Sequence, residues 1–140
     1  MDITFRRSEN LCNAAMFTFN NMHTYYQRYS VDWDVQLIEE KTRDLENYDI
    51  LLRGDVVGVF RLQYEEDCCY LRDLQVDASY QNRGIGQTVL NEVKRHTLQA
   101  KLHTLRLRVF KISPALELYK RNGFVIKEED ERFFNLELSI

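Results

Sequence analysis

Two glycines that follow a strand-like segment offer the clearest chemistry in this sequence. An alternating pattern ends at Val76, and Gly84 and Gly86 then open an amphipathic helix. Glycine lacks a Cβ, so the backbone can approach a ligand closely there. The free N–H groups at a helix N-terminus, reinforced by the helix dipole, attract anions. The segment therefore predicts a phosphate-binding turn of the kind that holds a nucleotide or a coenzyme.

Two common glycine motifs do not fit this turn. A P-loop requires Lys-Ser or Lys-Thr after its last glycine, and Gly86 is followed by Gln87 and Thr88. The dinucleotide-binding fingerprint requires a third glycine or alanine, and that position holds Val89. A lone G-x-G could equally mark a helix start that needs conformational freedom. The longer pattern, Gln81-x-x-Gly84-x-Gly86 after a strand, is more selective.

This longer pattern resembles a known family. The segment Gln81-Asn82-Arg83-Gly84-Ile85-Gly86 is similar to the Q/R-x-x-G-x-G/A signature of the GNAT superfamily of acetyl-coenzyme A-dependent N-acetyltransferases. A second block, from Pro114 to Phe124, resembles the superfamily segment that contains Pro-Ala, Leu-Tyr and Gly-Phe. The two blocks occur in the order and at the spacing that the superfamily shows.

The resemblance implies a set of acetyl-coenzyme A contacts. In the family the fourth and fifth strands splay apart, and the pantetheine arm hydrogen-bonds to the fourth strand, here at the backbone of Leu74 and Val76. The Val76 N–H would also donate to the thioester carbonyl. Tyr119 would protonate the leaving thiolate, because a phenol (pKa ~10) is protonated at neutral pH; the alternative for a tyrosine is a packing role. The other implied cofactor contacts are Gln81, Asn82, Arg83, Gly84, Ile85, Gly86, Gln87, Thr88 and Ser113.

Two positions depart from the family pattern. The asparagine that usually precedes Pro-Ala is Ser113, whose hydroxyl can cap the helix but reaches less far toward the pantetheine amides. Several family members carry a glutamate base on the fourth strand where this chain has Tyr70. Tyr70 itself, Asp73, Glu65 or a water could be the base, or the amine could arrive neutral, so the base is left open.

Composition restricts the class of protein. The chain has 140 residues, 44% of them hydrophobic and 29% charged, which fits a single globular domain over residues 1–140. The net charge of −3 argues against a nucleic-acid partner. The N-terminus lacks an apolar signal-peptide core, and no apolar run approaches the roughly 18 residues that span a bilayer. We therefore expect a cytoplasmic protein without a membrane partner.

The cysteines and histidines give no metal signature. Cys12, Cys68 and Cys69 lack the spacing of a metal or redox site. No pair of histidines and carboxylates has metal-ligand spacing, so no metal is predicted. Cys68 and Cys69, adjacent on a strand, should point to opposite faces, which predicts one buried and one exposed thiol.

Periodicity and turn residues predict the elements. Strands are expected at Ile3–Arg7, Tyr48–Arg53, Val56–Tyr64, Cys69–Val76, Thr104–Val109, Phe124–Lys127 and Arg132–Leu138. Helices are expected after an N-cap at Ser8, near Val35–Leu45, at Gly84–Gln99, and from a first turn at Pro114 to just before Gly123. The order β-α-α-β-β-β-α-β-α-β-β predicts an α/β (α+β) fold. It matches the GNAT fold, a mixed, mostly antiparallel sheet of about seven strands flanked by about four helices.

Three functions fit these observations. The first is an N-acetyltransferase that moves the acetyl group of acetyl-coenzyme A to a primary amine of a small molecule, by direct attack through a ternary complex. The second keeps the chemistry but acetylates a protein N-terminus or a lysine. The third is an acyl-coenzyme A-binding module without turnover. The acidic segments 65–67 and 128–131 are either solvated hairpin tips or a rim that attracts a cationic amine. A homodimer is left open.

Overall fold

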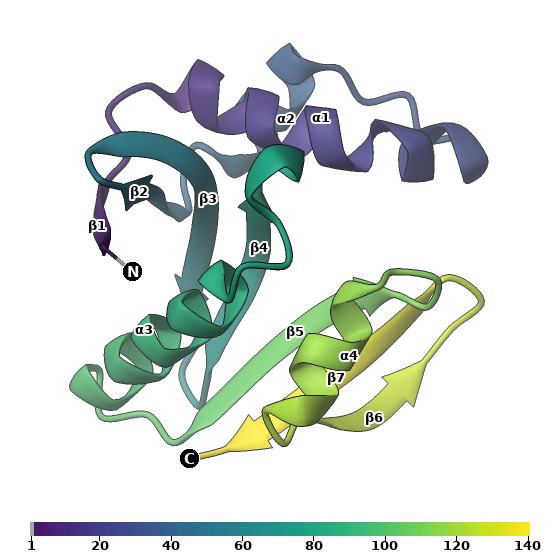
Figure 1. The fold of residues 1–140 in the computed structure, drawn as a ribbon. Helices are drawn as coiled ribbons and strands as arrows, with labels where there is room; N and C mark the ends of the chain where they lie inside the picture. Colours follow the sequence, from purple (N-terminus) through teal and green to yellow (C-terminus); the bar gives the residue numbers. More distant parts are fainter. Residues whose placement is uncertain (1) are drawn as a thin grey trace. The chain divides into compact units, whose positions relative to one another are not determined.

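The computed structural model describes residues 2–140 (Figure 1). Their elements, in order, are β1 (Ile3–Arg7), α1 (Leu11–Arg28), α2 (Val35–Thr42), β2 (Glu46–Leu52), β3 (Asp55–Tyr64), β4 (Cys69–Val76), the 3-10 turn η1 (Ala78–Tyr80), α3 (Ile85–Gln99), β5 (Thr104–Phe110), α4 (Ala115–Arg121), β6 (Val125–Glu129) and β7 (Phe133–Ser139). Within these residues the seven strands follow the sheet order β1-β2-β3-β4-β5-β7-β6. β4 pairs with β5 in parallel, whereas β5 and β7 are antiparallel. The predicted fold class and element order are confirmed.

The chain forms two compact units. The first contains the residues up to Leu62 together with Asp73–Ile85, and the second contains Gln63–Arg72 and Gly86–Ile140. β4 therefore belongs partly to each unit. A single domain over residues 1–140 stays a prediction.

The first unit packs α1 and α2 side by side (Figure 1). Its helical core contains Ala15, Tyr26 and Ile38, with Met22 and Trp33 packed against them. The structure corrects one helix start: Asn10, not Ser8, is the N-cap of α1, and its side chain accepts a hydrogen bond from the Asn13 N–H at 2.9 Å. The first residue of α1 is Leu11, which is too far along the chain for the Ser8 side chain to be the N-cap.

Ser8 has a different role in the first unit. Its N–H donates to the Asn47 carbonyl at 2.9 Å, next to the β1–β2 pairing, and its hydroxyl donates to Asp49 Oδ1 at 2.8 Å. Ser8 therefore belongs to the sheet side of the turn. The second helix is capped as well, by Asp34, whose carboxylate accepts from the Leu37 N–H at 2.8 Å.

The second unit contains most of α3, all of α4 and the antiparallel strands β5, β7 and β6. The predicted apolar stripe of α3 is confirmed, because Val89, Leu90 and Val93 are buried. The prediction for the adjacent cysteines is wrong: Cys68 and Cys69 are both fully buried. Cys68 precedes the first residue of β4, so the alternation of a strand does not apply to it.

Candidate active site

The end of β4 is held by two side-chain amides of the first unit. The Val76 carbonyl accepts hydrogen bonds from Asn21 Nδ2 at 2.8 Å and from Gln81 Nε2 at 2.9 Å. The next residue along the chain, Asp77, donates its N–H to the Val57 carbonyl at 2.8 Å. Val76 and Gln81, both predicted as site residues, are thus in direct contact. Leu74 lies two residues before Val76 on β4 and is half-buried.

Gly58 of β3 lies very close to the same part of β4. A Cβ added at Gly58 would sit 2.2 Å from the Gln75 carbonyl oxygen and 3.1 Å from Val76 Cα. The β2–β3 register shifts beside it, between Ile50 and Leu51. Only glycine permits this approach, so the shape of β3 helps to set the backbone path of Gln75 and Val76.

The predicted phosphate-binding turn has the backbone that such a turn requires. Asn82 and Gly84 have φ of +62° and +84°, in the left-handed region, just before α3 begins at Ile85. Alternating backbone handedness groups N–H donors into an anion-binding concavity. The first turn of α3 contains no acidic residue that would repel an anion. Arg83 is exposed, with its guanidinium 5.3 Å from the centre of the Tyr80 ring.

Several predicted residues can meet a phosphate through their backbone only. The Ile85 side chain is buried. The Gln87 side-chain amide exchanges two hydrogen bonds with the Asn122 amide, at 2.8 and 2.9 Å. Close packing also favours glycine at position 86, because an added Cβ would lie 2.9 Å from Leu118 Cδ2. The sequence alone did not show this contact. Thr88 is half-buried on the same turn of α3.

The second predicted block forms α4 in the second unit. The Ser113 hydroxyl accepts a hydrogen bond from the Ala115 N–H at 3.2 Å, so it caps the helix as expected. Pro114 occupies the N-cap position, one residue before the helix. Tyr119 is buried and contacts the Phe124 ring edge-on, with 5.7 Å between ring centres. Its role as an acid stays a prediction.

A buried ion pair in the first unit was not predicted from the sequence. Arg61 of β3 is fully buried and contacts the Asp73 carboxylate. The guanidinium also donates to Thr18 Oγ1 at 2.7 Å and to Asn47 Oδ1 at 2.6 Å. Its Nη2 is the one buried side-chain nitrogen or oxygen in residues 2–140 without a hydrogen-bond partner. The sequence signal was a lone arginine inside the apolar run of β3.

This ion pair bears on the choice of a base. Asp73 Oδ2 accepts from the Thr18 hydroxyl at 2.7 Å and from Arg61, while Oδ1 accepts from Gln75 Nε2 at 2.7 Å. Both carboxylate oxygens are therefore occupied, which argues against Asp73 as the base. The neighbouring Tyr26 has its pKa raised above the usual range, chiefly by burial and then by the negative charge of Asp73.

The other base candidates lie in the second unit. Tyr70 lines a cavity of about 300 Å³, together with Arg106, Leu107, Lys127, Glu128, Asn135, Leu136 and Glu137. The Arg72 guanidinium lies 4.6 Å from the centre of the Tyr70 ring. Glu65 is exposed and accepts a weak hydrogen bond from Cys68 Sγ at 3.8 Å. Tyr70, Glu65 and water therefore stay open as predictions.

One group in the second unit has the composition of a metal site. Ligand atoms of Glu65, Asp67 and Cys68 lie within 4.8 Å of one another. Arg106 already compensates their charge, with nitrogens 3.4 Å from Asp67 and 3.5 Å from Cys68 Sγ. Burial raises the pKa of the Cys68 thiol, which disfavours the thiolate that a metal would bind. These contacts account for the proximity of the three side chains without a bound ion.

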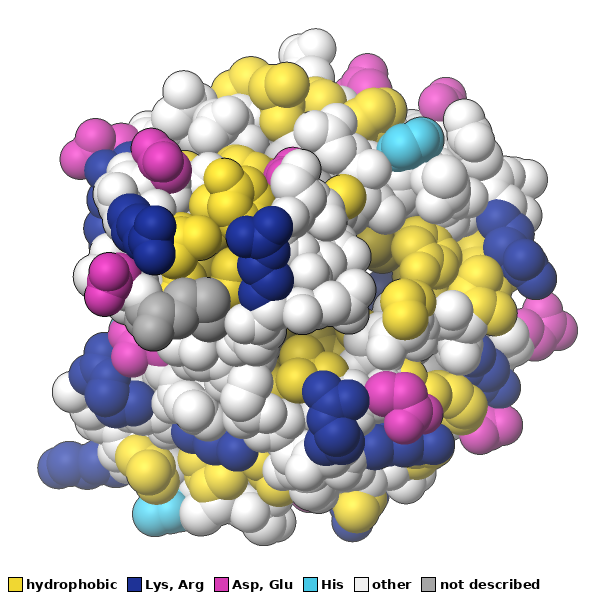
Figure 2. All heavy atoms as spheres, viewed as in Figure 1, with side chains coloured by type: hydrophobic (Ala, Val, Ile, Leu, Met, Phe, Trp, Pro, Cys, Tyr) yellow, Lys and Arg dark blue, Asp and Glu magenta, His cyan; other side chains and the backbone are white. Residues whose placement is uncertain are grey.

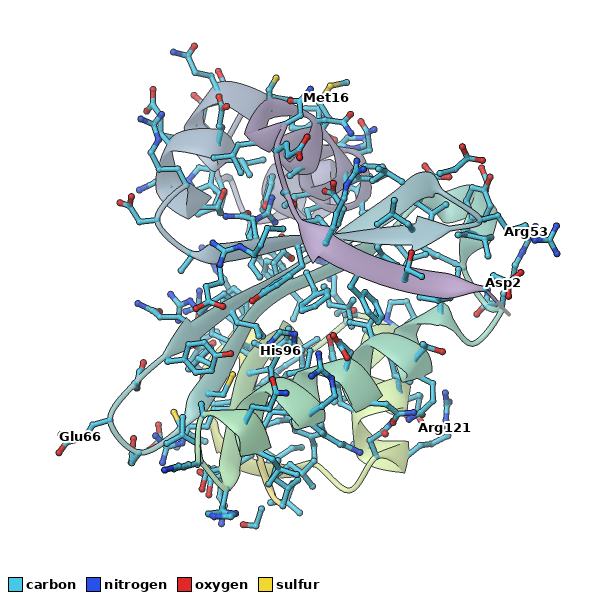
Figure 3. The ribbon with its side chains drawn as sticks, turned by 90° about the vertical axis from the view of Figure 1, so that its left-hand side faces the viewer. Asp2, Met16, Arg53, Glu66, His96 and Arg121 are labelled. Atoms are coloured by element: carbon cyan, nitrogen blue, oxygen red, sulfur yellow. The ribbon has the colours of Figure 1, made fainter. Side chains whose placement is uncertain are left out.

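The surface carries charged side chains of both signs. On the face shown in Figure 2, basic and acidic side chains are interspersed, without a continuous basic stripe. Glu66 projects away from the ribbon at the turn between β3 and β4 (Figure 3), as expected for a solvated hairpin tip.

None of the helices in residues 2–140 combines the length and the apolar character needed to cross a bilayer.

Comparison with known proteins identifies the family. Residues 45–126, more than half of the chain, match the model of the acetyltransferase (GNAT) domain. The chain belongs to the GNAT acetyltransferase family. The predicted family is thereby confirmed, and with it the class of acyltransferases. The match includes the turn before α3 and the whole block from Pro114 to Phe124.

One curated relative aligns with only part of this chain. The acetyltransferase PseH of Campylobacter jejuni subsp. jejuni serotype O:2 is 41% identical over 54 residues, which are 37% of this chain and 34% of that protein. The matched segment thus spans about a third of this curated relative.

Two solved structures share the fold over nearly the whole chain. PaiA N-acetyltransferase from Thermoplasma acidophilum, in complex with coenzyme A, is 17% identical with a TM-score of 0.74 and covers 100% of both chains. The ribosomal-protein-S18-alanine N-acetyltransferase from Escherichia coli is 20% identical with a TM-score of 0.75, over 99% of this chain and 94% of that one.

Proposed function

We propose that this GNAT chain transfers the acetyl group of acetyl-coenzyme A to a primary amine of a small molecule. The observation that carries the proposal is the turn before α3. Asn82 and Gly84 adopt left-handed φ values there, and the helix that follows has no acid in its first turn. Such a turn suits the pyrophosphate of a coenzyme. The similar structure of PaiA N-acetyltransferase contains coenzyme A, which supports this donor.

The cofactor would bind mainly through the backbone. The N–H groups from Gly84 to Thr88 would face the pyrophosphate, and the exposed Arg83 would add a positive charge. The pantetheine arm would hydrogen-bond to the backbone of Leu74 and Val76. The Gln81 side chain would act indirectly, because its amide donates to the Val76 carbonyl.

The transfer would proceed by direct attack in a ternary complex. The neutral amine forms a bond to the thioester carbon, and the resulting oxyanion accepts a hydrogen bond from the Val76 N–H. The C–S bond would then break and Tyr119 would donate its proton to the departing thiolate. The nitrogen would lose its extra proton to a base or to water, and Tyr119 would regain a proton from solvent. Removing one oxyanion donor typically costs about 100- to 1000-fold in rate.

Donor binding can be tested with two matched glycines. Gly84 and Gly54 have nearly the same backbone, with φ of +84° and +86°, and a Cβ added at either meets nothing within 4 Å. Gly84→Asp places a negative charge where the phosphate should bind, and we expect a loss of acetyl-coenzyme A affinity of at least about tenfold in calorimetry. Gly54→Asp, in the β2–β3 turn, carries the same strain and charge and should bind as the wild type does. Wild-type affinity in Gly84→Asp would refute the site.

The acceptor requires an assay of turnover. A panel of small primary amines, N-terminal peptides and lysine peptides is mixed with acetyl-coenzyme A, and release of the coenzyme A thiol is followed. Turnover with small amines supports the proposal. Turnover with peptides alone makes the chain a protein acetyltransferase. Tight binding without turnover of any acceptor makes it a binding module.

A further inference from the structure

We propose that Asn21 of α1 is a positioning residue for acetyl transfer, which holds the Val76 backbone so that its N–H is ready for the oxyanion. This inference rests on the proposed function, since that function assigns the oxyanion donor to Val76. Asn21 belongs to neither of the two motif blocks of the sequence. Its connection to Val76 follows from side-chain contacts within the first unit.

The amide of Asn21 is committed to the end of β4. Its Nδ2 donates to the Val76 carbonyl at 2.8 Å and to Gln75 Oε1 at 3.1 Å. An amide NH₂ has two N–H groups, so both are used on two consecutive residues of β4. Gln81 Nε2 also donates to the Val76 carbonyl, at 2.9 Å, and supplies its second partner. One carbonyl oxygen is thus held by a helix and by the phosphate-binding turn together.

Gln75, which Asn21 contacts, is itself hydrogen-bonded to a residue of a further network. Gln75 Nε2 donates to Asp73 Oδ1 at 2.7 Å, and Asp73 in turn contacts the fully buried Arg61. Thr18, one turn before Asn21 on α1, donates to Asp73 Oδ2 at 2.7 Å. α1 therefore reaches β4 through two side chains on the same helix face. A partly buried, hydrogen-bonded network of this kind restricts the movement of the strand that it holds.

The Asn21 contact fixes one of the two peptide planes that meet at Val76 Cα, and the Val76 N–H lies in the other. The carbonyl belongs to the peptide plane that follows Val76, and the N–H of that plane, on Asp77, donates to Val57 at 2.8 Å. The plane before Val76 contains its own N–H and the Gln75 carbonyl, which packs against Gly58. Both planes are therefore restricted. A donor fixed in advance needs no reorganisation in the transition state, and a misplacement of about 1 Å can cost roughly 100-fold in rate.

The test uses two neighbouring asparagines. Asn21→Asp keeps the side-chain shape but replaces the N–H donors with a carboxylate oxygen facing the Val76 carbonyl. Asn20→Asp adds the same charge at an exposed position of the same helix. We expect Asn21→Asp to lower kcat about 10- to 100-fold with acetyl-coenzyme A affinity changed less than about threefold. Asn20→Asp should keep kcat within about twofold of the wild type, as expected of a surface substitution.

A second readout separates this proposal from the proposed function. The backbone amide signals of ¹⁵N-labelled protein are followed during titration with acetyl-coenzyme A. In Asn21→Asp the response of the Val76 amide should change, while that of Gly84 stays as in the wild type. If the wild type binds acetyl-coenzyme A but acetylates no amine, the proposed function fails, and the Val76 signal still decides the role of Asn21. If Asn21→Asp matches Asn20→Asp in both kcat and the Val76 signal, the positioning role is overturned.

Discussion

The side-chain amides of Gln87 and Asn122 hydrogen-bond to each other in both directions, at 2.8 and 2.9 Å. Gln87 lies in the first turn of α3, and Asn122 is the C-cap of α4. Asn122 also accepts a hydrogen bond from Lys94 at 3.3 Å and donates to the Leu118 carbonyl at 2.8 Å. The pair therefore joins the two helices of the second unit that carry the matched motifs.

This pair leads to a prediction about stability. We expect Asn122→Ala to lower the free energy of unfolding by about 1–2 kcal/mol, because it removes both hydrogen bonds to the Gln87 amide, which retains only its bond to Asn91 at 3.2 Å. In a double-mutant cycle measured by urea unfolding, Gln87→Ala and Asn122→Ala should be coupled by at least about 0.5 kcal/mol. Gln87→Ala should change acetyl-coenzyme A affinity less than about threefold, because only its backbone would face the phosphate. Strictly additive effects would show that the pair does not contribute.

Two glycines in close contacts should respond very differently to alanine. A Cβ at Gly58 meets the Gln75 carbonyl oxygen, which is backbone, at 2.2 Å, whereas a Cβ at Gly86 meets only the mobile end of the Leu118 side chain at 2.9 Å. Gly58→Ala should therefore lower the free energy of unfolding by more than about 2 kcal/mol. Gly86→Ala should change it by less than about 1 kcal/mol, since alanine also favours the helix. Urea unfolding of both variants measures the two changes. Equal losses in the free energy of unfolding would contradict the prediction.

The sequence predicted features that depend on local pattern. The apolar stripe of α3 follows from a spacing of three and four residues, and the start of that helix next to Gly84 follows from the glycine motif. Features that depend on distant partners were missed. Arg61 is buried because Asp73, Asn47 and Thr18 surround it, and Thr18 is 43 positions away. Charged residues are almost never fully buried unless paired, so only the fold could reveal this position.

The same limit applies to the candidate site. Gln81 and Gly84 could be predicted as site residues because their motif is continuous in the sequence, whereas Asn21 contacts Val76 from 55 positions away. The glycine motif predicts that Gly86 allows close approach of an anion, whereas its close contact in the structure is with Leu118 of α4. The predicted N-cap of α1 is two residues early, since Ser8 and Asn10 are both favoured caps. The motifs therefore predict where the site lies, and the side-chain contacts show what holds those residues in place.

Alkaline pH should weaken the first unit through Tyr48. Burial and the hydrogen bond from its hydroxyl to Glu46, at 2.6 Å, raise the pKa of Tyr48 to about 12. A phenol in the unfolded chain titrates near ~10, so the folded state favours the neutral form. The stabilisation is fully present below pH ~10 and is lost as the pH rises through the folded pKa. Tyr48→Phe cannot ionise there, so its free energy of unfolding should fall less steeply above pH ~10. Urea unfolding at several pH values measures this. If the free energy of unfolding had the same pH dependence in both proteins, the prediction would be wrong.

Tyr119 provides the most demanding test of the chemistry. If its hydroxyl protonates the leaving thiolate, it acts mainly in the transition state. Tyr119→Phe should then lower kcat while acetyl-coenzyme A affinity stays within about threefold. General acids contribute about 100- to 10,000-fold, and the low end is expected because a thiolate is already a tolerable leaving group.

The matched control for Tyr119→Phe is Tyr29→Phe at the C-cap of α1. Tyr29 is half-buried and lies outside both motif blocks, so loss of its hydroxyl should keep kcat within about twofold of the wild type. Tyr119 is buried against Phe124, so the variant retains the ring and its edge-on contact. A kcat loss of less than about threefold, under conditions where chemistry limits the rate, would return Tyr119 to a packing role. Thiolate release would then occur without a tyrosine acid, since a thiol pKa of ~8.5 already makes unassisted departure feasible near neutral pH.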